Sequence, residues 1–519
     1  MKKLVLFIVL SLLISTSFAH TPEEWKSRSI YQVLTDRFAR TNGSEIPCSN
    51  ISDYCGGTFK GIMNNLDYIQ GMGFDAIWIS PVVANTPGGY HGYWAKNLYE
   101  INENYGTPEE LIALVDECHR RDVWVMVDIV ANHMAPLSTS SGGFADFIPF
   151  NDVSYYHTEL DCGTIDWKNQ TEVEICWLAE LPDLDQDIPF VKEKLIEWIG
   201  ELVAKYKFDG LRIDTVPYVS KEFWKEFTDA SGVYTIGEVF NELLPYDAGY
   251  QGCIDAVLNY PLYYVMRDVF HQKKSMYRVE SYYRDDFPGW IDSTLLGNFV
   301  DNHDNPRFLY ENGDIIAFKS ALAFAMTTVG IPITYYGGEQ AYGGGADPEN
   351  REPLWTNMDP HSDIYDFLAQ INKFRKESKF YSLTQIQRYA DDHFYVFSRG
   401  DFLFAFTNTR ENQQRTITYH NYTEGTVLCN VFYARDCVTV QNGQFTVFLN
   451  NGEVKIFFPK EREVIIEKEP TAPIEVRPVE EGTQVNTANT AVYSLLRGAH
   501  PKVDEQSIME FEMSLEKKQ

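Results

Sequence analysis

The sequence lacks an excess of basic residues and, beyond its N-terminal segment, a long apolar run. Of its 519 residues, 44 are Lys or Arg and 74 are Asp or Glu, so the formal net charge is −30. Such a surface repels polyanions, which makes nucleic acids and anionic membrane surfaces poor partners. No later stretch reaches the roughly 20 apolar residues of a membrane-spanning helix. We therefore expect no nucleic-acid or membrane partner, and a neutral substrate remains open.

Cysteine is also scarce, and its spacing does not fit a zinc site. There are eight cysteines, of which Cys118 and Cys253 are left over as candidate free thiols. The other six fall into short-range pairs that can form disulfides in an oxidising compartment. These pairs are Cys48–Cys55, Cys162–Cys176 and Cys429–Cys437.

The N-terminal residues predict export. Lys2 and Lys3 precede an apolar run, Leu4–Ile14, and small residues around Ala19 offer a cleavage site. The run is too short to span a membrane comfortably, so residues 1–19 are interpreted as a signal peptide. We expect a monomer that is secreted or delivered to a digestive vacuole. Possible N-glycosylation sites are Asn42, Asn50, Asn169 and Asn421.

Between about residues 30 and 380, apolar strand-like runs alternate with amphipathic helical patterns. One helix is marked by Val191, Leu195 and Trp198, which repeat at helical spacing. Near-continuous apolar strands are typical of a parallel sheet buried on both faces. Eight strand–helix units predict a (β/α)₈ TIM barrel, although a doubly wound sheet would give a similar pattern. The expected strands are Ile30–Leu34, Phe74–Ser80, Val123–Val130, Gly210–Asp214, Tyr234–Glu238, Ala256–Asn259, Leu296–Val300 and Ile331–Tyr336.

Two segments depart from this alternation. Residues 134–185 are rich in Gly, Ser, Thr and Asp and lack a clear helix, which predicts an irregular inserted domain, the B domain. Residues 385–460 carry strand patterns and Asn-Gly hairpin signals, which predict an antiparallel β domain. The barrel would comprise residues 20–133 and 186–384, and the polar residues 461–519 a disordered tail. The strand patterns are Phe394–Ser398, Phe402–Asn408, Gln414–His420, Thr426–Tyr433, Gln444–Leu449 and Val454–Phe458.

Several of the barrel strands end in carboxylic acids. Asp128, Asp214 and Glu238 lie at or near the ends of three successive strands, and Asp304 follows the seventh. In a barrel the carboxyl ends of the strands meet at one mouth, where active sites form. Carboxyl groups gathered there repel each other, which drives their pKa values apart. A single Asp after a strand is more often a cap, but several together favour glycoside hydrolysis, which needs one acid and one anion.

These segments resemble the four signature regions of the α-amylase family, glycoside hydrolase family 13. They are residues 128–133 (DIVANH), 210–214 (GLRID), 237–239 (GEV) and 299–304 (FVDNHD). Leu181–Asp185 is similar to a further motif at the end of the family's B domain, and Tyr90–Trp94 and Asn350–Glu352 also match. The order and spacing are most like those of secreted fungal α-amylases, over roughly residues 22–460.

The resemblance implies separate roles for the carboxylates. Asp214 would be the nucleophile, Glu238 the proton donor and Asp304 the transition-state stabiliser. Arg212 would keep Asp214 ionised, and a retaining nucleophile–acid pair stands about 5–5.5 Å apart. The implied activity is retaining endo-hydrolysis of α-1,4-glucosidic bonds in starch, glycogen and malto-oligosaccharides.

The resemblance also implies residues that bind an α-glucan and a calcium ion. The implied substrate-binding residues are His91, Tyr93, Trp94, His133, Arg212, His303, Asp347 and Arg351, with ring faces offered by Tyr93 and Trp94. The implied Ca²⁺ ligands are the side chains of Asn132, Glu174 and Asp183 and the backbone carbonyl of Tyr218. Such a set of hard oxygen donors suits Ca²⁺, and Asp128 would support it indirectly.

Two adjacent positions depart from the fungal pattern. Pro217 and Tyr218 stand where fungal α-amylases carry Lys-His, and that Lys contacts sugar on the reducing side of the cut bond. The alternatives to endo-hydrolysis are therefore exo-maltogenic, cyclodextrin-cleaving and transglycosylating activities of the same family. A catalytically inactive glucan-binding relative is a further alternative, disfavoured because all three carboxylates are present.

Overall fold

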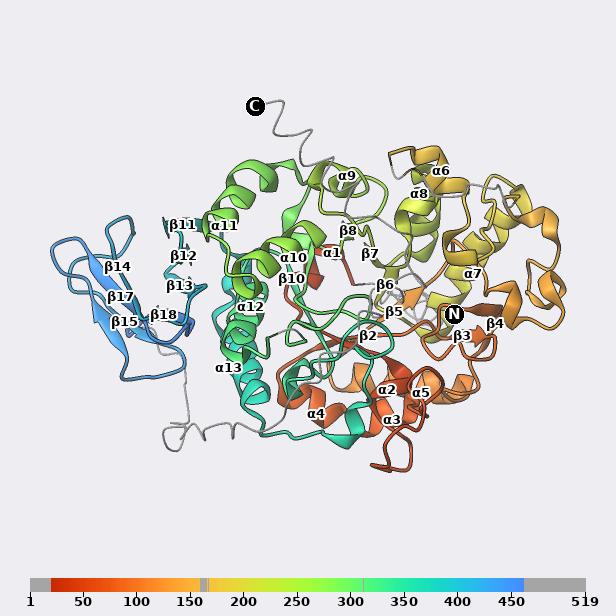
Figure 1. The fold of residues 1–519 in the computed structure, drawn as a ribbon, viewed down its shortest axis with the longest axis horizontal. Helices are drawn as coiled ribbons and strands as arrows, with labels where there is room; N and C mark the ends of the chain where they lie inside the picture. The colour runs from red at the N-terminus through yellow and green to blue at the C-terminus, as the bar shows by residue number, and fades with distance from the viewer. Residues whose placement is uncertain (1–19, 159–165, 167, 311, 462–519) are drawn as a thin grey trace, which may run out of the picture.

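The computed structural model describes residues 20–158, 166, 168–310 and 312–461 (Figure 1). The expected signal peptide, the tail beyond residue 461 and Cys162 lie outside these residues, so the pairing of Cys162 with Cys176 stays a prediction. The disulfides Cys48–Cys55 and Cys429–Cys437 are present, and Cys118 and Cys253 are free thiols. Among the described helices, none combines the length and apolarity that crossing a membrane requires.

Eight parallel strands form the centre of the molecule. They are β1 (Ile30–Val33), β2 (Ala76–Ile79), β5 (Trp124–Ile129), β6 (Gly210–Ile213), β7 (Tyr234–Gly237), β8 (Ala256–Val257), β9 (Gly297–Asn298) and β10 (Ile331–Tyr335). Their order in the sheet is β8-β7-β6-β5-β2-β1-β10-β9, and a parallel bridge between Leu258 and Gly297 joins the two ends. This closure confirms the predicted barrel and excludes the doubly wound alternative, whose sheet would stay open.

Helices surround the strands and bury their apolar faces against them (Figure 1). In α7, Val191, Leu195 and Trp198 are buried at the predicted helical spacing. In α5, Thr107 and Glu110 form a reciprocal capping box, which fixes where the helix begins. The helices of this region are α1 (Pro22–Trp25), α2 (Thr35–Phe38), α3 (Phe59–Asn64), α4 (Leu66–Gly71), α5 (Pro108–Arg120), α7 (Pro189–Tyr206), α8 (Lys221–Ser231), α9 (Leu244–Ala248), α10 (Tyr260–Met266), α11 (Tyr277–Ser281), α12 (Ile315–Thr327) and α13 (Asp363–Ser378).

The segment between β5 and α7 is irregular, as expected, with one correction. It contains a helix, α6 (Gln170–Ile175), that the composition did not reveal. Its one turn and a half is too short for a periodic apolar pattern to stand out. The segment lies beside the hairpin of β3 (Val83–Asn85) and β4 (Ala95–Ile101), where a bridge joins Ile148 of the segment to Asn97 of β4. It returns to the barrel at a bridge between His133 and Asp183.

The C-terminal region is an antiparallel β domain beside α12 and α13, at the left of Figure 1. Its strands are β11 (Gln385–Ala390), β12 (Phe394–Arg399), β13 (Phe402–Thr407), β14 (Gln413–Ile417), β15 (Val427–Asn430), β16 (Cys437–Thr439), β17 (Phe445–Leu449) and β18 (Lys455–Pro459). Six of these match predicted strands, whereas β11 and β16 were missed because they are polar or very short. Rings of Phe324 on α12 and Phe406 on β13 lie 5.1 Å apart and join the domain to the barrel.

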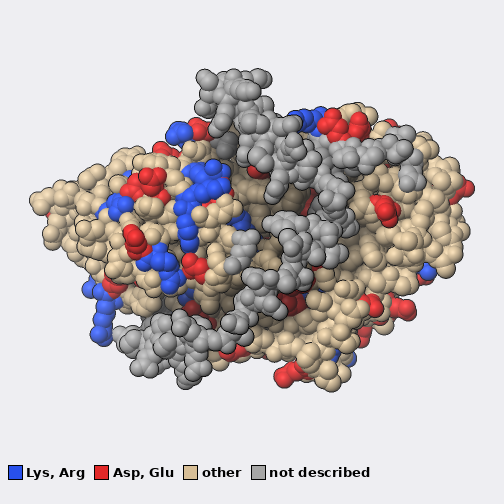
Figure 2. Space-filling model, in the orientation of Figure 1, with Lys and Arg blue, Asp and Glu red and all other residues tan. Residues whose placement is uncertain are grey.

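Charged side chains of both signs are spread over the face seen in Figure 2. Lys and Arg gather toward the C-terminal domain, whereas Asp and Glu occur on both halves of that face. The net charge of −30 is therefore not concentrated in a single acidic patch on this side.

Candidate active site

Arg212 joins three carboxyl groups at the ends of neighbouring strands. Its guanidinium donates from one nitrogen to Asp128 at 3.0 Å and to Asp214 at 2.8 Å. Its second terminal nitrogen lies 3.1 Å from Oε2 of Glu238. Because β5, β6 and β7 pair in parallel, side chains at their carboxyl ends point to the same mouth of the barrel. The predicted nucleophile and proton donor are thus held by one cation.

All four groups are taken out of water. Arg212 and Asp128 are 1% exposed, Glu238 6% and Asp214 7%. Arg212 also lies over the rings of Trp78 and Tyr93, with distances of 5.2 and 5.9 Å to the ring centroids. Because water screens these charges only weakly here, the ionisation of each carboxyl group depends strongly on the charges next to it.

Burial sets the protonation of Glu238. It raises the pKa of this carboxyl to about 8, and the negative charges of Asp214 and Asp304 act in the same direction, while Arg212 opposes them. Glu238 also accepts a weak hydrogen bond from the N–H of Thr215 at 3.3 Å and one from the hydroxyl of Tyr260 at 3.5 Å. Near neutral pH this carboxyl holds a proton, which is the state that a general acid needs.

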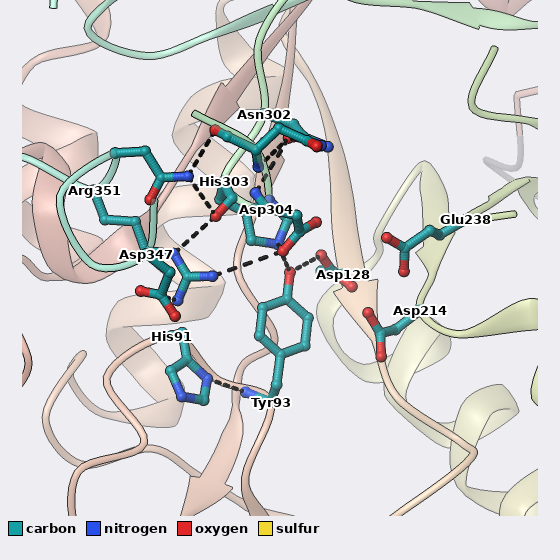
Figure 3. Close-up of polar contacts among 12 residues, drawn as sticks. His91, Tyr93, Asp128, Asp214, Glu238, Asn302, His303, Asp304, Asp347 and Arg351 are labelled. Carbon is teal, nitrogen blue, oxygen red and sulfur yellow. Dashed lines mark hydrogen bonds and ion pairs between the residues drawn. The ribbon is translucent and has the colours of Figure 1, made fainter. Parts of the chain in front are cut away.

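In Figure 3, Asp304 lies next to the hydroxyl of Tyr93, and Asp128 lies between Asp304 and the pair Asp214 and Glu238 in that view. It follows β9 in a turn in which Oδ1 of Asn302 accepts the N–H of Asp304 at 3.1 Å. Its carboxylate lies 3.7 Å from Arg351 and 3.5 Å from Nε2 of His303. With its side chain 16% exposed, Asp304 is more accessible to a ligand than Asp128.

A chain of hydrogen bonds connects β1 to Asp128 through two of the predicted sugar-binding residues. The amide N–H of Gln32 donates to Nδ1 of His303 at 2.9 Å, and Nε2 of His303 lies 2.7 Å from the hydroxyl of Tyr93. That hydroxyl donates to Asp128 at 2.7 Å. Burial lowers the pKa of His303 to about 4, so the ring is neutral and, with Nδ1 accepting, its proton lies on Nε2.

The predicted sugar platforms are packed differently from one another. The ring of Tyr93 is stacked with His303 at 5.4 Å and with His91 at 5.6 Å. Trp94 is half-buried and meets His91 edge-on at 5.0 Å. His91 accepts the N–H of Tyr93 at 3.0 Å, and burial lowers its pKa. Contact of these rings with sugar stays a prediction.

Arg351 and Asp347 form a second polar group beside Asp304 (Figure 3), which Tyr90 joins through its hydroxyl. Arg351 lies 3.1 Å from Asp347, and the hydroxyl of Tyr90 donates to Asp347 at 3.0 Å. Nε of Arg351 donates to the carbonyl of His303 at 3.0 Å. The site therefore contains the predicted Asp347 and Arg351 in contact with each other.

His133 is more enclosed than the sequence indicated. It is 3% exposed, and its Nε2 lies 3.2 Å from the carbonyl of Tyr93. Burial lowers its pKa, so the ring is neutral near pH 7. Its contact with the sugar being cleaved remains a prediction.

The residues predicted to bind calcium form two pairs. Asn132 and Asp183 lie side by side, because the N–H of Leu184 donates to the carbonyl of Asn132 at 2.8 Å. Both are buried, and Oδ1 of Asn132 has no hydrogen-bond partner within the described residues. Such an uncompensated oxygen beside a buried carboxylate fits a cation. Asp183 is also 2.6 Å from Nδ1 of His157.

The second pair is Glu174 on α6 and Tyr218 at the end of the 3₁₀ turn Val216–Tyr218. Gln170 joins them, since its amide donates to Glu174 and to the carbonyl of Pro217, both at 2.8 Å. In the described part of the chain no group of three or more His, Cys, Asp or Glu side chains is placed to hold a metal. The predicted set has only two carboxylates; its other donors are an amide and a carbonyl oxygen.

The sequence did not reveal several residues that hold the side chains of the site in place through hydrogen bonds. Trp78 donates to Asp128 at 3.1 Å, and the amide of Asn302 donates to Tyr260 at 2.9 Å. Gln32 carried a usable signal, because it is a polar residue within the apolar strand β1. Trp78 and Tyr260 gave none, since an aromatic residue in or after a strand is usually core.

The fold and the site can now be compared with those of known proteins. A closed (β/α)₈ barrel with carboxyl groups gathered at its mouth is the architecture of many glycoside hydrolases, and residues 32–392 match the model of the α-amylase catalytic domain. α-Amylase 2 of Schwanniomyces occidentalis is 39% identical over 460 residues, covering 84% of this chain and 90% of that protein. The chain belongs to the α-amylase family of glycoside hydrolases.

Further similar proteins support this family assignment. α-Amylase 1 of Lipomyces kononenkoae is 44% identical over 380 residues, which cover 69% of this chain but 60% of that longer protein. The solved α-amylase of Malbranchea cinnamomea superposes with a TM-score of 0.81 at 38% identity, covering 85% of this chain and 98% of that one. A cyclomaltodextrin glucanotransferase structure, CldA, superposes with a TM-score of 0.75 at 27% identity, covering 83% and 98%. The same fold thus occurs in a transferase.

Proposed function

We propose that this protein is an exported, monomeric retaining endo-hydrolase of α-1,4-glucosidic bonds in starch, glycogen and malto-oligosaccharides. The observation that carries the proposal is that Arg212 holds both Asp214 and Glu238, while burial keeps a proton on Glu238. One guanidinium spanning both groups favours the short separation of a retaining pair over the wider gap of an inverting one.

The proposed reaction has two steps. Glu238 gives its proton to the glycosidic oxygen while Asp214 attacks the anomeric carbon, so the C–O bond breaks and a glycosyl ester forms. Glu238, now ionised, takes a proton from water as that water attacks the same carbon, which frees Asp214 and restores the acid. Asp304 stabilises the positive charge that develops on the sugar ring in both transition states.

The remaining predicted residues would bind the glucan. His303 and His133 would contact hydroxyls of the sugar being cleaved, and His91, Asp347 and Arg351 would bind the non-reducing side. Tyr93 and Trp94 would offer ring surfaces to the sugar, the contact that aromatic side chains provide best. The support for this assignment is that Arg351, Asp347 and Asp304 lie in one connected polar group.

Product analysis tests the mode of cleavage. With soluble starch we expect large oligosaccharides early in the reaction, because an endo-enzyme cuts inside the chain. The products should first appear as the α-anomer by NMR, as retention requires. Small sugars alone from the first minutes, or cyclic products, would instead support the exo-acting or transferase alternatives, which Pro217 leaves open.

We also propose that Asn132, Glu174, Asp183 and the carbonyl of Tyr218 hold a calcium ion that ties the B domain to the barrel. The unpartnered Oδ1 of Asn132 beside Asp183 supports it. Bound there, the ion would supply structural cross-linking rather than a reacting group.

Removal of calcium is expected to lower Tm. A ligand that binds only the folded state adds about 2.7 kcal/mol of stability at a concentration of 100 times its Kd. Scanning calorimetry with and without EGTA measures the shift. Asp183→Asn should lower Tm and lose sensitivity to EGTA, whereas Asp185→Asn, a neighbouring carboxylate outside the ligand set, should keep it. An EGTA-independent Tm for the unmodified protein would refute the site.

A further inference from the structure

We propose that Arg267 is a positioning residue for the active site. Through Asp301 and the carbonyl of Pro306, it fixes the loop that carries His303 and Asp304. The inference rests on the proposed function, because its readout is the work of Asp304 in that reaction.

The loop receives little support from the barrel sheet. Strand β9 has two residues, and its pairing with β10 ends at Asn298 opposite Pro332. His303 and Asp304 therefore lie beyond the last residue paired in the sheet, and their backbone must be held by side chains. On one side Asn350 does this, because its amide donates to the carbonyls of His303 and Asn305, both at 2.9 Å.

Arg267 holds the loop from the other side. One terminal nitrogen of its guanidinium lies 3.1 Å from Oδ1 of Asp301 and 2.7 Å from the carbonyl of Pro306. The same oxygen of Asp301 accepts the N–H of Phe308 at 2.7 Å. These contacts join a residue before Asp304 to two residues after it, so they close the loop into a fixed turn.

The surroundings of Arg267 keep its guanidinium in place. It lies over the rings of Tyr263 and Phe308, at 5.3 and 5.4 Å from their centroids. The side chain is 15% exposed, and that of Asp301 4%. Arg267 is also the first residue of a π-helical turn, Arg267–His271, that continues α10. Such turns are rare and occur often at functional sites.

Asp301 depends on this partner. Burial raises its pKa, and Arg267 and Arg307 act against that effect. Its second oxygen, Oδ2, has no hydrogen-bond partner in the part of the chain that the structure describes. Without Arg267, the buried carboxylate of Asp301 would keep only the charge of Arg307 and the N–H of Phe308 as compensation, and we expect the loop to relax toward water. Movement of about 1 Å at a group acting on the transition state can cost about 100-fold in rate.

The test is Arg267→Met, with steady-state kinetics on malto-oligosaccharides well below the Tm of each variant. We expect kcat to fall by about 10- to 100-fold, while KM changes by less than about threefold, because Asp304 acts on the transition state. Arg267→Lys keeps the charge and should recover part of kcat. A residue with only a structural role would lower Tm and leave kcat unchanged.

Arg278→Met is the matched control. Arg278 lies on α11, is 51% exposed and forms an ion pair with Asp268 away from the loop, so kcat should stay at the value of the unmodified protein. If Arg267→Met keeps that kcat, the proposal is wrong. If it does not fold, Arg267→Lys and Asp301→Asn decide in the same way. Failure of the proposed function looks different: the unmodified protein itself would not hydrolyse the substrate.

Discussion

Glu238→Gln is expected to lower kcat/KM on soluble starch by about 10²- to 10⁴-fold, the usual contribution of a general acid–base group. Gln has nearly the same shape as Glu and its amide oxygen can still accept from Arg212. Its amide has no acidic proton to give to the leaving oxygen. Binding of starch, measured by sedimentation with the insoluble polymer, should remain. Glu242→Gln is the matched control, since Glu242 is an exposed residue of the same loop and should leave activity unchanged.

A substrate with a better leaving group shows whether Glu238→Gln has removed only the acid or has damaged the whole active site. A maltosyl fluoride needs little protonation to depart, so Glu238→Gln should form the glycosyl-enzyme from it at a rate much closer to that of the unmodified protein. If the variant were equally slow on the fluoride and on starch, the substitution would have damaged more than the acid. Near-full turnover of starch by Glu238→Gln would refute the assignment.

The pH profile follows from the same group. Activity requires the protonated form of Glu238, and burial raises its pKa to about 8. We expect kcat/KM to fall as pH rises through about 8, because the acid is then ionised. An alkaline limb centred near the ordinary pKa of glutamic acid would contradict this expectation.

Arg212→Met is expected to lower the free energy of unfolding by about 3–5 kcal/mol, because it leaves buried carboxyl groups without their cation. Asp128, Asp214 and Glu238 would all lose this partner. Urea unfolding measures the change. The hydrolytic rate should fall as well, because Asp214 and Glu238 would lose the guanidinium that contacts them both.

The loss should depend on pH in a definite direction. Burial already holds the folded-state pKa values of Asp128 and Glu238 above their usual values, and the loss of Arg212 would raise them further, so the folded variant binds more protons than the unfolded chain over a wider interval of pH. Stability of the variant then falls as pH rises through that interval, and the difference from the unmodified protein is smallest in acid.

Two further variants serve as a rescue and a control for Arg212→Met. Adding Asp128→Asn to Arg212→Met removes one of the uncompensated charges and should restore part of the stability. Arg120→Met breaks an ion pair with Glu117 in which Arg120 is 66% exposed, and should change stability by less than about 1 kcal/mol. If Arg212→Met were no more destabilising than Arg120→Met, Arg212 would not be the centre of the site.

The sequence determined the barrel and its catalytic candidates because both depend on local signals. Most of the eight strands are predominantly apolar runs bounded by polar residues, and burial on both faces favours that pattern. Asp214 and Glu238 follow such runs directly and Asp304 lies in the loop after another, so a parallel barrel brings them to one mouth. The short helix α6 and the strands β11 and β16 were missed because few residues carry their pattern.

Only the tertiary structure decided how these residues are held. That one guanidinium contacts Asp128, Asp214 and Glu238 depends on the register of three strands, which no local pattern specifies. The chain from Gln32 through His303 and Tyr93 joins residues up to 271 positions apart. Such contacts form because burial removes water as the alternative partner, and burial is a property of the whole fold.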